Sequence, residues 1–370
     1  MPPPSPLVAL GIVSGSTYHE RRTALRSTWL RSPECTLGEV LARFIVARPL
    51  DNTNLTAALE RESSTENDLM LLETGISGRV WSPLHTMFRW FQFATQNKPF
   101  RLAGYIGKMD DDVYCNVGEL TRHLRHMQMV PRMSQNASVY YGVFYWTSYD
   151  QGKYQHTGSS YTMLGAQIAS RRCIKEHTCE GSFPFTTGAM QLLSRTLANS
   201  FSSSPAAIRH IERSRMLVHR PRKSPAFEDV WMGYALYALL PTVANITMVS
   251  LDRFNFYFDA AVRPTMKNTT FLVHLATNKL GERIEAAHNF SVRQHCVSRS
   301  VPHCHRFKVP SCRDRTVNGD CMNRTRYYLH KYGSACQHTP DPSVCPRGPA
   351  YPILVGRYAK MKRKDRSSAH

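Results

Sequence analysis

Hydrophobic and polar positions alternate in long blocks along the first third of the chain. Four apolar runs predict buried strands, and they cover residues 6–15, 39–50, 65–73 and 100–109. Amphipathic patterns predict helices over residues 18–30 and 82–96. One face of the second helix carries apolar side chains at helical spacing, namely Leu84, Met87, Phe88 and Phe91. Strands that alternate with helices are typical of an α/β domain with a parallel sheet.

Three consecutive aspartates, Asp110, Asp111 and Asp112, follow the last of these strands. Ligands of parallel sheets bind at the carboxyl ends of strands, which is where the aspartates fall. Mg²⁺ and Mn²⁺ take oxygen ligands and often bridge protein carboxylates to the phosphates of a ligand. The aspartates therefore indicate a metal site, and a solvated acidic turn is the alternative.

Two arginines follow the first strand at the same predicted edge of the sheet. Arg22 and Arg26 are four residues apart and so share one face of the predicted helix. Arginine side chains together with a helix N-terminus suit a diphosphate group. The alternative is a basic face that is only solvated.

The segment "SFPFTTGAMQLLSR", residues 182–195, reads as an aromatic and proline turn, then Gly188, then an apolar stretch. Without a side chain, Gly188 would let the backbone approach a ligand, or it would simply mark a turn. The segment "AFEDVWMGYALYAL", residues 226–239, predicts a helix that opens with Glu228 and Asp229. Acidic residues at a helix start are commonly just partners of the helix dipole.

A histidine, His274, ends the apolar run in "TTFLVHL". A single histidine at such a position is more often a core or surface residue than a ligand. An imidazole beside carboxylate oxygens would, however, suit Mn²⁺ better than Mg²⁺. His274 therefore remains a candidate metal ligand.

Composition adds a strong positive charge, which is concentrated at one end. The chain has 370 residues, is 42% hydrophobic and carries a formal charge of +20. Residues 291–370 hold 16 basic and 4 acidic residues, so they contribute +12 of that charge. Such a charge favours polyanions, anionic membrane surfaces or phosphorylated ligands, although the final run "KMKRKDRSS" is also typical of a solvated tail.

Cysteines and glycosylation signals both indicate the secretory pathway. Six of the ten cysteines lie in residues 291–370 without a C-x-x-C motif, which favours disulfides over a zinc or redox site. Six N-x-S/T sequons are present, at Asn54, Asn136, Asn245, Asn268, Asn289 and Asn323. The first residues do not form a signal peptide, and no stretch is long enough to span a membrane. We therefore expect the natural N-terminus to lie upstream of Met1.

Four blocks in a fixed order resemble glycosyltransferase family 31, the β-1,3-galactosyl- and β-1,3-N-acetylglucosaminyltransferases. The blocks are "RRTALRSTW", "KMDDDVYCN", "FPFTTGAMQLLSR" and "FEDVWMGYAL". Residues 65–91 also resemble the segment that links the first two blocks in the family. Together these blocks cover roughly residues 7–280, whereas the cysteine-rich tail has no counterpart.

The resemblance implies a GT-A type fold with a central mixed, mostly parallel sheet flanked by helices. Residues 1–290 would form the catalytic domain, with a donor half over about 7–120 and an acceptor half over about 121–290. Residues 291–370 would form a basic, cysteine-rich C-terminal extension.

The resemblance also assigns roles to residues. It implies a UDP-sugar donor, Mn²⁺ and inversion at the anomeric carbon. Asp110 and Asp112 match the metal motif, with Asp112 the direct ligand, and His274 resembles a late metal-contacting histidine. The expected donor-binding residues are Arg22, Arg26, Asp110, Asp111 and Gly188. Asp229 matches the catalytic base, and Glu228 lies beside it.

The chain departs from the family at two places. His85-Thr86 stands where relatives commonly have lysine before threonine, which removes one expected charge from the donor site. Residues 183–188 lack the frequent cysteine and second glycine, which alters the expected acceptor pocket.

The sequence therefore predicts a UDP-sugar-dependent transferase that forms β-1,3 links to a hydroxyl of a glycan acceptor on a glycoprotein or glycolipid. We expect it in the Golgi membrane with a lumenal catalytic domain, held by an anchor upstream of this sequence, and we expect no nucleic-acid partner. One alternative is an inactive relative that binds UDP-sugar or glycan, which the presence of both DDD and EDV disfavours. The other is a basic polyanion-binding protein, which the location of the charge in the tail disfavours.

Overall fold

A computed structural model gives the architecture. It describes residues 5–49, 52–73, 83–130, 133–150, 155–160, 166, 170, 179–218, 227–240, 245–251, 256–259, 272–275, 283–289 and 354–359. Among these residues no helix combines the length and the apolar character needed to cross a membrane.

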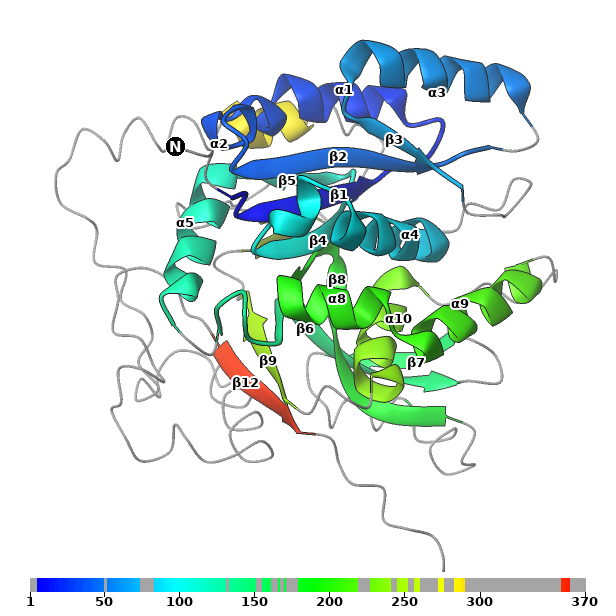
Figure 1. Cartoon of the computed structure of the whole chain (residues 1–370), viewed down its shortest axis with the longest axis vertical. Coiled ribbons are helices and arrows are strands. Elements are labelled where there is room, and N and C mark those ends of the chain that lie inside the picture. Colours follow the sequence, from blue (N-terminus) through cyan, green and yellow to red (C-terminus); the bar gives the residue numbers. More distant parts are fainter. Residues whose placement is uncertain are drawn as a thin grey trace, which may run out of the picture.

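A twisted nine-stranded sheet forms the centre of the described structure, in the order β12-β9-β6-β8-β4-β1-β2-β3 with β7 paired to β6 (Figure 1). The strands are β1 (Val8–Val13), β2 (Val40–Ala47), β3 (Leu69–Leu72), β4 (Tyr105–Asp110), β6 (Val139–Asp150), β7 (Gln155–Ser160), β8 (Cys179–Ser194), β9 (Asn245–Ser250) and β12 (Leu354–Ala359). Strands β1 to β4 run parallel, whereas β8 is antiparallel to both β4 and β6. The expected mixed sheet of a GT-A type fold is confirmed.

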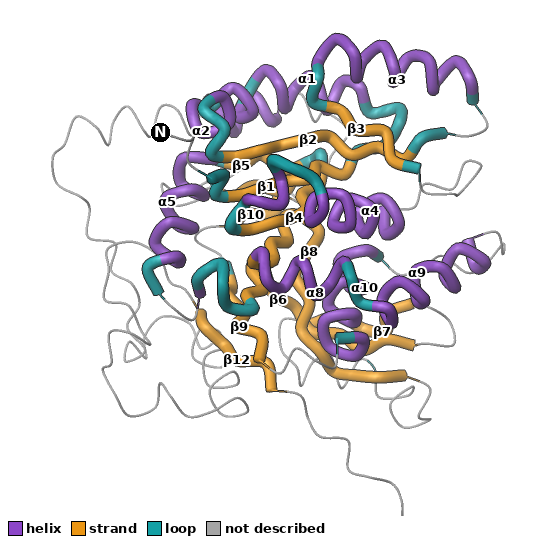
Figure 2. The backbone as a smooth tube through the Cα atoms, in the orientation of Figure 1, coloured by secondary structure: helices purple, strands orange, loops and turns teal. Residues whose placement is uncertain are grey.

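Helices cover both faces of this sheet (Figure 2). They are α1 (His19–Ser27), η1 (Trp29–Arg31), α2 (Pro33–Thr36), α3 (Thr53–Glu66), α4 (Pro83–Gln96), η2 (Phe100–Leu102), α5 (Val117–Gln128), α8 (Arg195–Ser202), α9 (Pro205–Val218), α10 (Glu228–Tyr234) and a π-helical turn, η4 (Ala235–Leu239), and residues 283–289 are also helical. The three helices expected from the sequence are confirmed. The sequence analysis missed α3, which is largely polar and has only one buried residue, Leu59.

Successive side chains of β1 point to opposite faces of the large sheet, and each face carries its own hydrophobic core. Val8, Leu10 and Ile12 are buried with side chains of α1, α3 and α5, whereas Ala9 and Val13 are buried with side chains of α4, α8 and α10. Because successive side chains of a strand point to opposite faces, a central parallel strand is apolar throughout. This explains why these strands appear as continuous apolar runs in the sequence.

Helix α4 packs directly on β1 and β4. A Cβ atom on Gly11 would lie 2.7 Å from the ring of Trp90, so the absence of a side chain permits the contact. The Trp90 indole Nε1 donates a hydrogen bond of 2.8 Å to the carbonyl of Gly107 on β4. The packing therefore holds α4 against the two strands that lead to the predicted site.

The predicted aromatic and proline turn before Gly188 is wrong, because residues 179–194 form the strand β8. Its pairing with β6 is interrupted, however, since the register shifts between Gly142 and Phe144, whose partners on β8 are Gln191 and Thr186. The residues between Thr186 and Gln191 on β8 thus form a bulge opposite a single residue of β6. Gly188 lies within that bulge.

A second, three-stranded sheet consists of β5 (Val113–Cys115), β10 (Phe256–Asp259) and β11 (Leu272–Leu275), in the order β10-β11-β5. Strands β11 and β5 are antiparallel, and His274 is the partner of Val113. The backbone amide of Leu275 also donates to the carbonyl of Asp112, over 2.8 Å. This small sheet therefore ties a late segment of the chain to the aspartate turn.

The predicted domain boundaries remain predictions. One sheet contains strands of both predicted halves, because β4 pairs with β8. Within residues 291–370, only 354–359 are described, and they form β12, which pairs antiparallel with β9. The six cysteines of that extension lie outside the described residues.

Replacement of Phe201 tests the packing on the α4 side of the sheet. Its ring makes edge contacts with Phe88, Phe91 and Trp231 at centroid distances of 5.5, 5.2 and 5.7 Å. We expect Phe201→Ala to lower the free energy of unfolding by about 3–5 kcal/mol, because a large cavity would remain. Urea unfolding measures the change. Leu37→Ala is the control, because Leu37 is 84% exposed and should cost less than about 0.5 kcal/mol. Equal stability of the two variants would contradict the assignment.

Candidate functional site

The carboxyl ends of β1 and β4 lie side by side and position the aspartate turn. Val13, the last residue of β1, pairs with Asp110, the last residue of β4. The next residues along both strands are in contact, because the Ser14 hydroxyl donates to Asp111 over 2.7 Å. The aspartates are therefore at the edge of the sheet where the sequence placed them.

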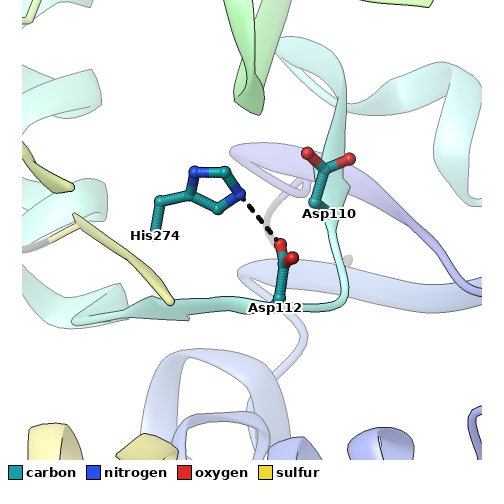
Figure 3. Close-up of side chains that lie close together, drawn as sticks. All are labelled: Asp110, Asp112 and His274. Carbon is teal, nitrogen blue, oxygen red and sulfur yellow. Dashed lines mark ion pairs between the residues drawn. The ribbon is translucent and has the colours of Figure 1, made fainter. Parts of the chain in front are cut away.

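Three of the predicted ligands form one cluster (Figure 3). Asp110, Asp112 and His274 each offer a ligand atom within 4.8 Å of the other two. His274 Nε2 lies 3.1 Å from Asp112 Oδ1. The turn after β4 carries the two carboxylates, and the register between β11 and β5 brings the imidazole beside them. The prediction that these three residues lie together is confirmed.

The donor set fits a divalent cation. Two carboxylates and one imidazole suit a metal that accepts both oxygen and nitrogen ligands. Burial raises the pKa of Asp110 to about 7; Lys108 opposes this rise, while Glu228 and Asp112 add to it. A bound cation would relieve the repulsion among these carboxylates. The residues of this cluster would therefore hold a divalent metal.

Asp111 points away from this cluster and anchors the turn instead. Besides Ser14, its carboxylate accepts a hydrogen bond of 2.9 Å from Arg21. Arg21 also lies 3.9 Å from Asp112 and 4.1 Å from the ring centroid of Tyr18. The sequence analysis missed Arg21, although it is in the same RRxxxR block as the two arginines that were chosen.

Arg22 and Arg26 serve the fold rather than an open ligand site. Arg22 is 1% exposed and donates from Nε and NH2 to the two oxygens of Glu62, over 2.8 and 2.7 Å. Its NH1 donates to Ser14 and to the carbonyl of Gly15. Arg26 binds Glu62 and Asp68. Both arginines thus form ion pairs that join α1 to α3, and their contact with a donor remains a prediction.

A pocket of about 310 Å³ opens beside the metal cluster. It is lined by Asp110, Tyr145, Thr187, Gly188, Phe227, Glu228, Asp229 and His274. A Cβ atom on Gly188 would lie 2.5 Å from Asp110 Oδ2, so the bulge of β8 touches the metal ligand closely. Gly188 thus lines the site as predicted, and its contact with a donor remains a prediction.

Asp229 lies in this pocket at the start of α10. Its Oδ1 accepts a hydrogen bond of 2.7 Å from the backbone amide of Val230. Burial nevertheless raises its pKa to about 7, with a further rise from Glu228. A helix start favours the ionised form of an acidic side chain, but here burial outweighs the backbone donors. A carboxylate with a pKa near the working pH is suited to accept a proton.

Glu228 is engaged elsewhere. Its Oε1 lies 2.6 Å from the ammonium of Lys108, which is fully buried on β4. The same ammonium lies 2.6 Å from Asp110 Oδ1. Glu228 is thus the counter-ion of a lysine, and its predicted role as a catalytic carboxylate is not supported by this contact.

Two aromatic rings complete the pocket, and the sequence analysis did not select them. Phe227 is 64% exposed although it is a large apolar residue, and its ring lies 5.3 Å from that of His156. Tyr145 lies on β6 with its ring 6.1 Å from Phe185. An aromatic residue directly before the acidic pair was the available signal for Phe227.

His85, one of the two departures from the family pattern, does not reach the pocket lining. It is fully buried in α4, and its Nε2 lies 3.1 Å from the Ser214 hydroxyl of α9. The residue therefore joins two helices of the core.

Comparison with known proteins gives one family. The model of the galactosyltransferase family matches residues 20–218, which is more than half of the chain. The chain is also 28% identical over 134 residues to the hydroxyproline O-galactosyltransferase GALT2 of Arabidopsis thaliana. That match covers 36% of this chain but only 18% of the relative's length.

Solved structures resemble the chain at low identity. Mouse xyloside xylosyltransferase 1 in its apo form is 11% identical, with a TM-score of 0.38 over 74% of this chain and 99% of its own. The galactosyltransferase LgtC in complex with donor and acceptor sugar analogs is 10% identical, with a TM-score of 0.33 over 80% of this chain and 96% of its own.

Acid titration tests the ion pairs beneath the site. Burial opposes the charge of Glu62, but Arg22 and Arg26 hold its pKa at about 2, below the usual 4.5. This stabilisation is therefore complete above pH 4.5 and is lost as the pH falls towards 2. We expect the unfolding free energy of the wild type to fall more steeply across this range than that of Glu62→Gln.

Urea unfolding at several pH values measures both slopes. At pH 7 the variant should be less stable by about 3–5 kcal/mol, because Arg22 keeps a buried charge without its partner. Glu60→Gln provides the control, since Glu60 forms an exposed pair with Arg48 and should cost less than about 1 kcal/mol. Parallel pH profiles for wild type and Glu62→Gln would count against the assigned role.

Proposed function

Because the chain belongs to the galactosyltransferase family, we propose that it transfers a hexose or N-acetylhexosamine from a UDP-sugar to a hydroxyl of a glycan acceptor, with inversion and formation of a β-1,3 link. The observation that carries the proposal is a pocket lined both by two members of the metal-ligand cluster, Asp110 and His274, and by Asp229. Inversion needs a proton acceptor on the face of the sugar opposite the leaving group, and a bound metal would stabilise that leaving group.

Asp110, Asp112 and His274 would hold the metal, which we propose to be Mn²⁺. When bound, such an ion stabilises the negative charge that grows on the phosphate oxygen of the departing UDP. Arg21 supports this end of the site, because its guanidinium holds Asp111 and lies near Asp112. The turn is thereby kept in place while its carboxylates face the ligand.

Asp229 would act as the general base. The acceptor hydroxyl must lose a proton as its oxygen attacks the anomeric carbon, and a carboxylate on the attacking side can take that proton. Asp229 lines the pocket, and its pKa of about 7 suits the transfer. Glu228 does not compete for this role, because Lys108 occupies its Oε1.

Phe227 and Tyr145 would receive the acceptor. Sugar rings have apolar C–H faces, and an exposed aromatic ring offers a matching surface next to the base. The pocket volume of about 310 Å³ lies at the small end of the range for ligand pockets, which is roughly 300–1,000 Å³. The pocket would therefore hold the reacting sugar, while the rest of each substrate extends beyond it.

A Golgi location with a lumenal catalytic domain also forms part of the proposal. Cys179 is disulfide-bonded, which suits an oxidising compartment. The sequon residues Asn54, Asn136 and Asn289 are exposed, so oligosaccharide attachment would not disturb the core. Asn268, Asn323 and the tail cysteines lie outside the described residues.

Donor-dependent UDP release, screened over several UDP-sugars with Mn²⁺, tests the proposed activity. Release that needs both an acceptor and one donor supports transfer. Mn²⁺-independent binding of glycan without turnover would instead favour an inactive relative. Salt-sensitive binding to heparin without turnover would favour a polyanion-binding protein.

Removal of a metal ligand should abolish most of this activity. We expect Asp112→Asn to lower turnover at least about 10²-fold, because a neutral amide replaces a hard anionic ligand. Steady-state UDP release at saturating donor measures the loss, and circular dichroism confirms folding. Glu73→Gln is the control, because Glu73 is a 66% exposed acid paired with Arg48. Near-normal turnover of Asp112→Asn would remove the residue from the metal site.

Removal of the base should separate chemistry from donor binding. We expect Asp229→Asn to lower the transfer rate about 10²- to 10⁴-fold, whereas UDP affinity changes little. A residue that only caps the helix would instead cost about 1 kcal/mol of stability or less and leave catalysis unchanged. Transfer rate, UDP affinity and melting temperature of this one variant distinguish the two roles. Transfer at the wild-type rate would exclude Asp229 as the base.

A further inference from the structure

Lys108 is a buried cation to which the proposed function has assigned no role. It lies on β4 two residues before Asp110, so both side chains are on the same face of the strand. Its side chain is 0% exposed. A buried charge is costly unless it is paired and hydrogen-bonded, so its partners reveal what it does.

The ammonium of Lys108 has three acceptors, one for each of its N–H groups. They are Asp110 Oδ1 at 2.6 Å, Glu228 Oε1 at 2.6 Å and the Gly188 carbonyl at 3.1 Å. These acceptors belong to three different elements, since Asp110 ends β4, Gly188 lies in the bulge of β8, and Glu228 begins α10. One side chain thus joins three separate walls of the pocket.

Each of these three contacts positions a proposed metal ligand or the helix end that carries the proposed base. Asp110 is a member of the metal cluster, and Lys108 fixes one of its two oxygens. Glu228 directly precedes Asp229, so the contact with Glu228 fixes the end of α10 that carries the base. Gly188 touches Asp110 from the other side. The distance between the metal ligand and the base therefore depends on Lys108.

We propose that Lys108 is a positioning residue, which holds the metal ligand Asp110 and the base-bearing end of α10 at a fixed separation, with Glu228 as its counter-ion. This inference rests on the proposed function, because it takes Asp110 as a metal ligand and Asp229 as the base. Groups that hydrogen-bond to metal-ligating carboxylates commonly change metal affinity or activity 10- to 100-fold when they are replaced.

A double-mutant cycle of Lys108→Met and Glu228→Gln tests the proposal. Each single variant should lower kcat about 10- to 100-fold. The double variant should lose no more than the worse single one, because both substitutions remove the same contact. Multiplied losses would show that Lys108 and Glu228 act independently and would overturn the assignment of Glu228 as the counter-ion. A wild-type kcat in either single variant would also overturn the proposal.

Mn²⁺ affinity, followed by the electron paramagnetic resonance signal of the free ion, gives a readout that does not depend on turnover. The double variant removes one positive and one negative charge, so the net charge of the site is unchanged. We expect its Mn²⁺ affinity to fall about tenfold, because Asp110 is no longer held in place. Wild-type affinity in the double variant would overturn the positioning role.

Folding controls keep these outcomes distinct. Glu228→Gln retains the Lys108–Asp110 pair and should remain folded. The double variant should melt above Lys108→Met, because it leaves one buried carboxylate, Asp110, without its cation instead of two. Arg125→Met, which removes the cation of the exposed Arg125–Glu39 pair, should match the wild type in every measurement.

A wild type that neither binds Mn²⁺ nor turns over any UDP-sugar would contradict the proposed function itself. An active wild type with an unaffected double variant would contradict only the role of Lys108.

Discussion

Repulsion between carboxylates is the constraint on which the site depends. Asp110, Glu228 and Asp229 line one pocket, and Asp112 lies beside Asp110 in the metal cluster. Burial raises the pKa of Asp110 and Asp229, so their ionised forms are costly to keep. A buried cation, Lys108, forms ion pairs with two of these carboxylates, Asp110 and Glu228. This leaves an excess of negative charge beside His274, which is the place where the donor set fits a divalent ion.

The sheet provides the geometry that this charge balance requires. Parallel strands β1 and β4 end at the same edge, so the turn after β4 is held by Ser14 and Arg21 from the β1 side. The bulge of β8 supplies Gly188 at the point where a side chain would collide with Asp110. Below this layer, the Arg22–Glu62 pair fixes α1 against α3. Rigid backbone and buried ion pairs therefore support groups that must remain close despite their repulsion.

Much of this arrangement could be predicted from the sequence, and the failures have physical causes. Continuous apolar runs predicted β1, β2 and β4, because central parallel strands are buried on both faces. The order of the motifs predicted the meeting of Asp110, Asp112 and His274. The ion pairs of Arg22 and Arg26 were missed because the partners Glu62 and Asp68 lie in and after α3, a helix whose weakly amphipathic pattern gave no signal. The role of Lys108 was missed because two of its three partners, Gly188 and Glu228, come from β8 and α10, far along the chain.

The pairing of β12 with β9 means that residues 354–359 cover one edge of the large sheet. Residues 245–250 run parallel to β6 on one side, and on the other side their backbone groups meet those of residues 354–359. An uncovered strand at that position would offer a row of free amides and carbonyls to any other extended chain. Residues 354–359 therefore cover the edge of the large sheet, so the predicted boundary near residue 290 does not separate the strands into different sheets. Sequence change in residues 354–359 would then be limited by the solubility of the protein, because those residues protect a strand edge from other chains.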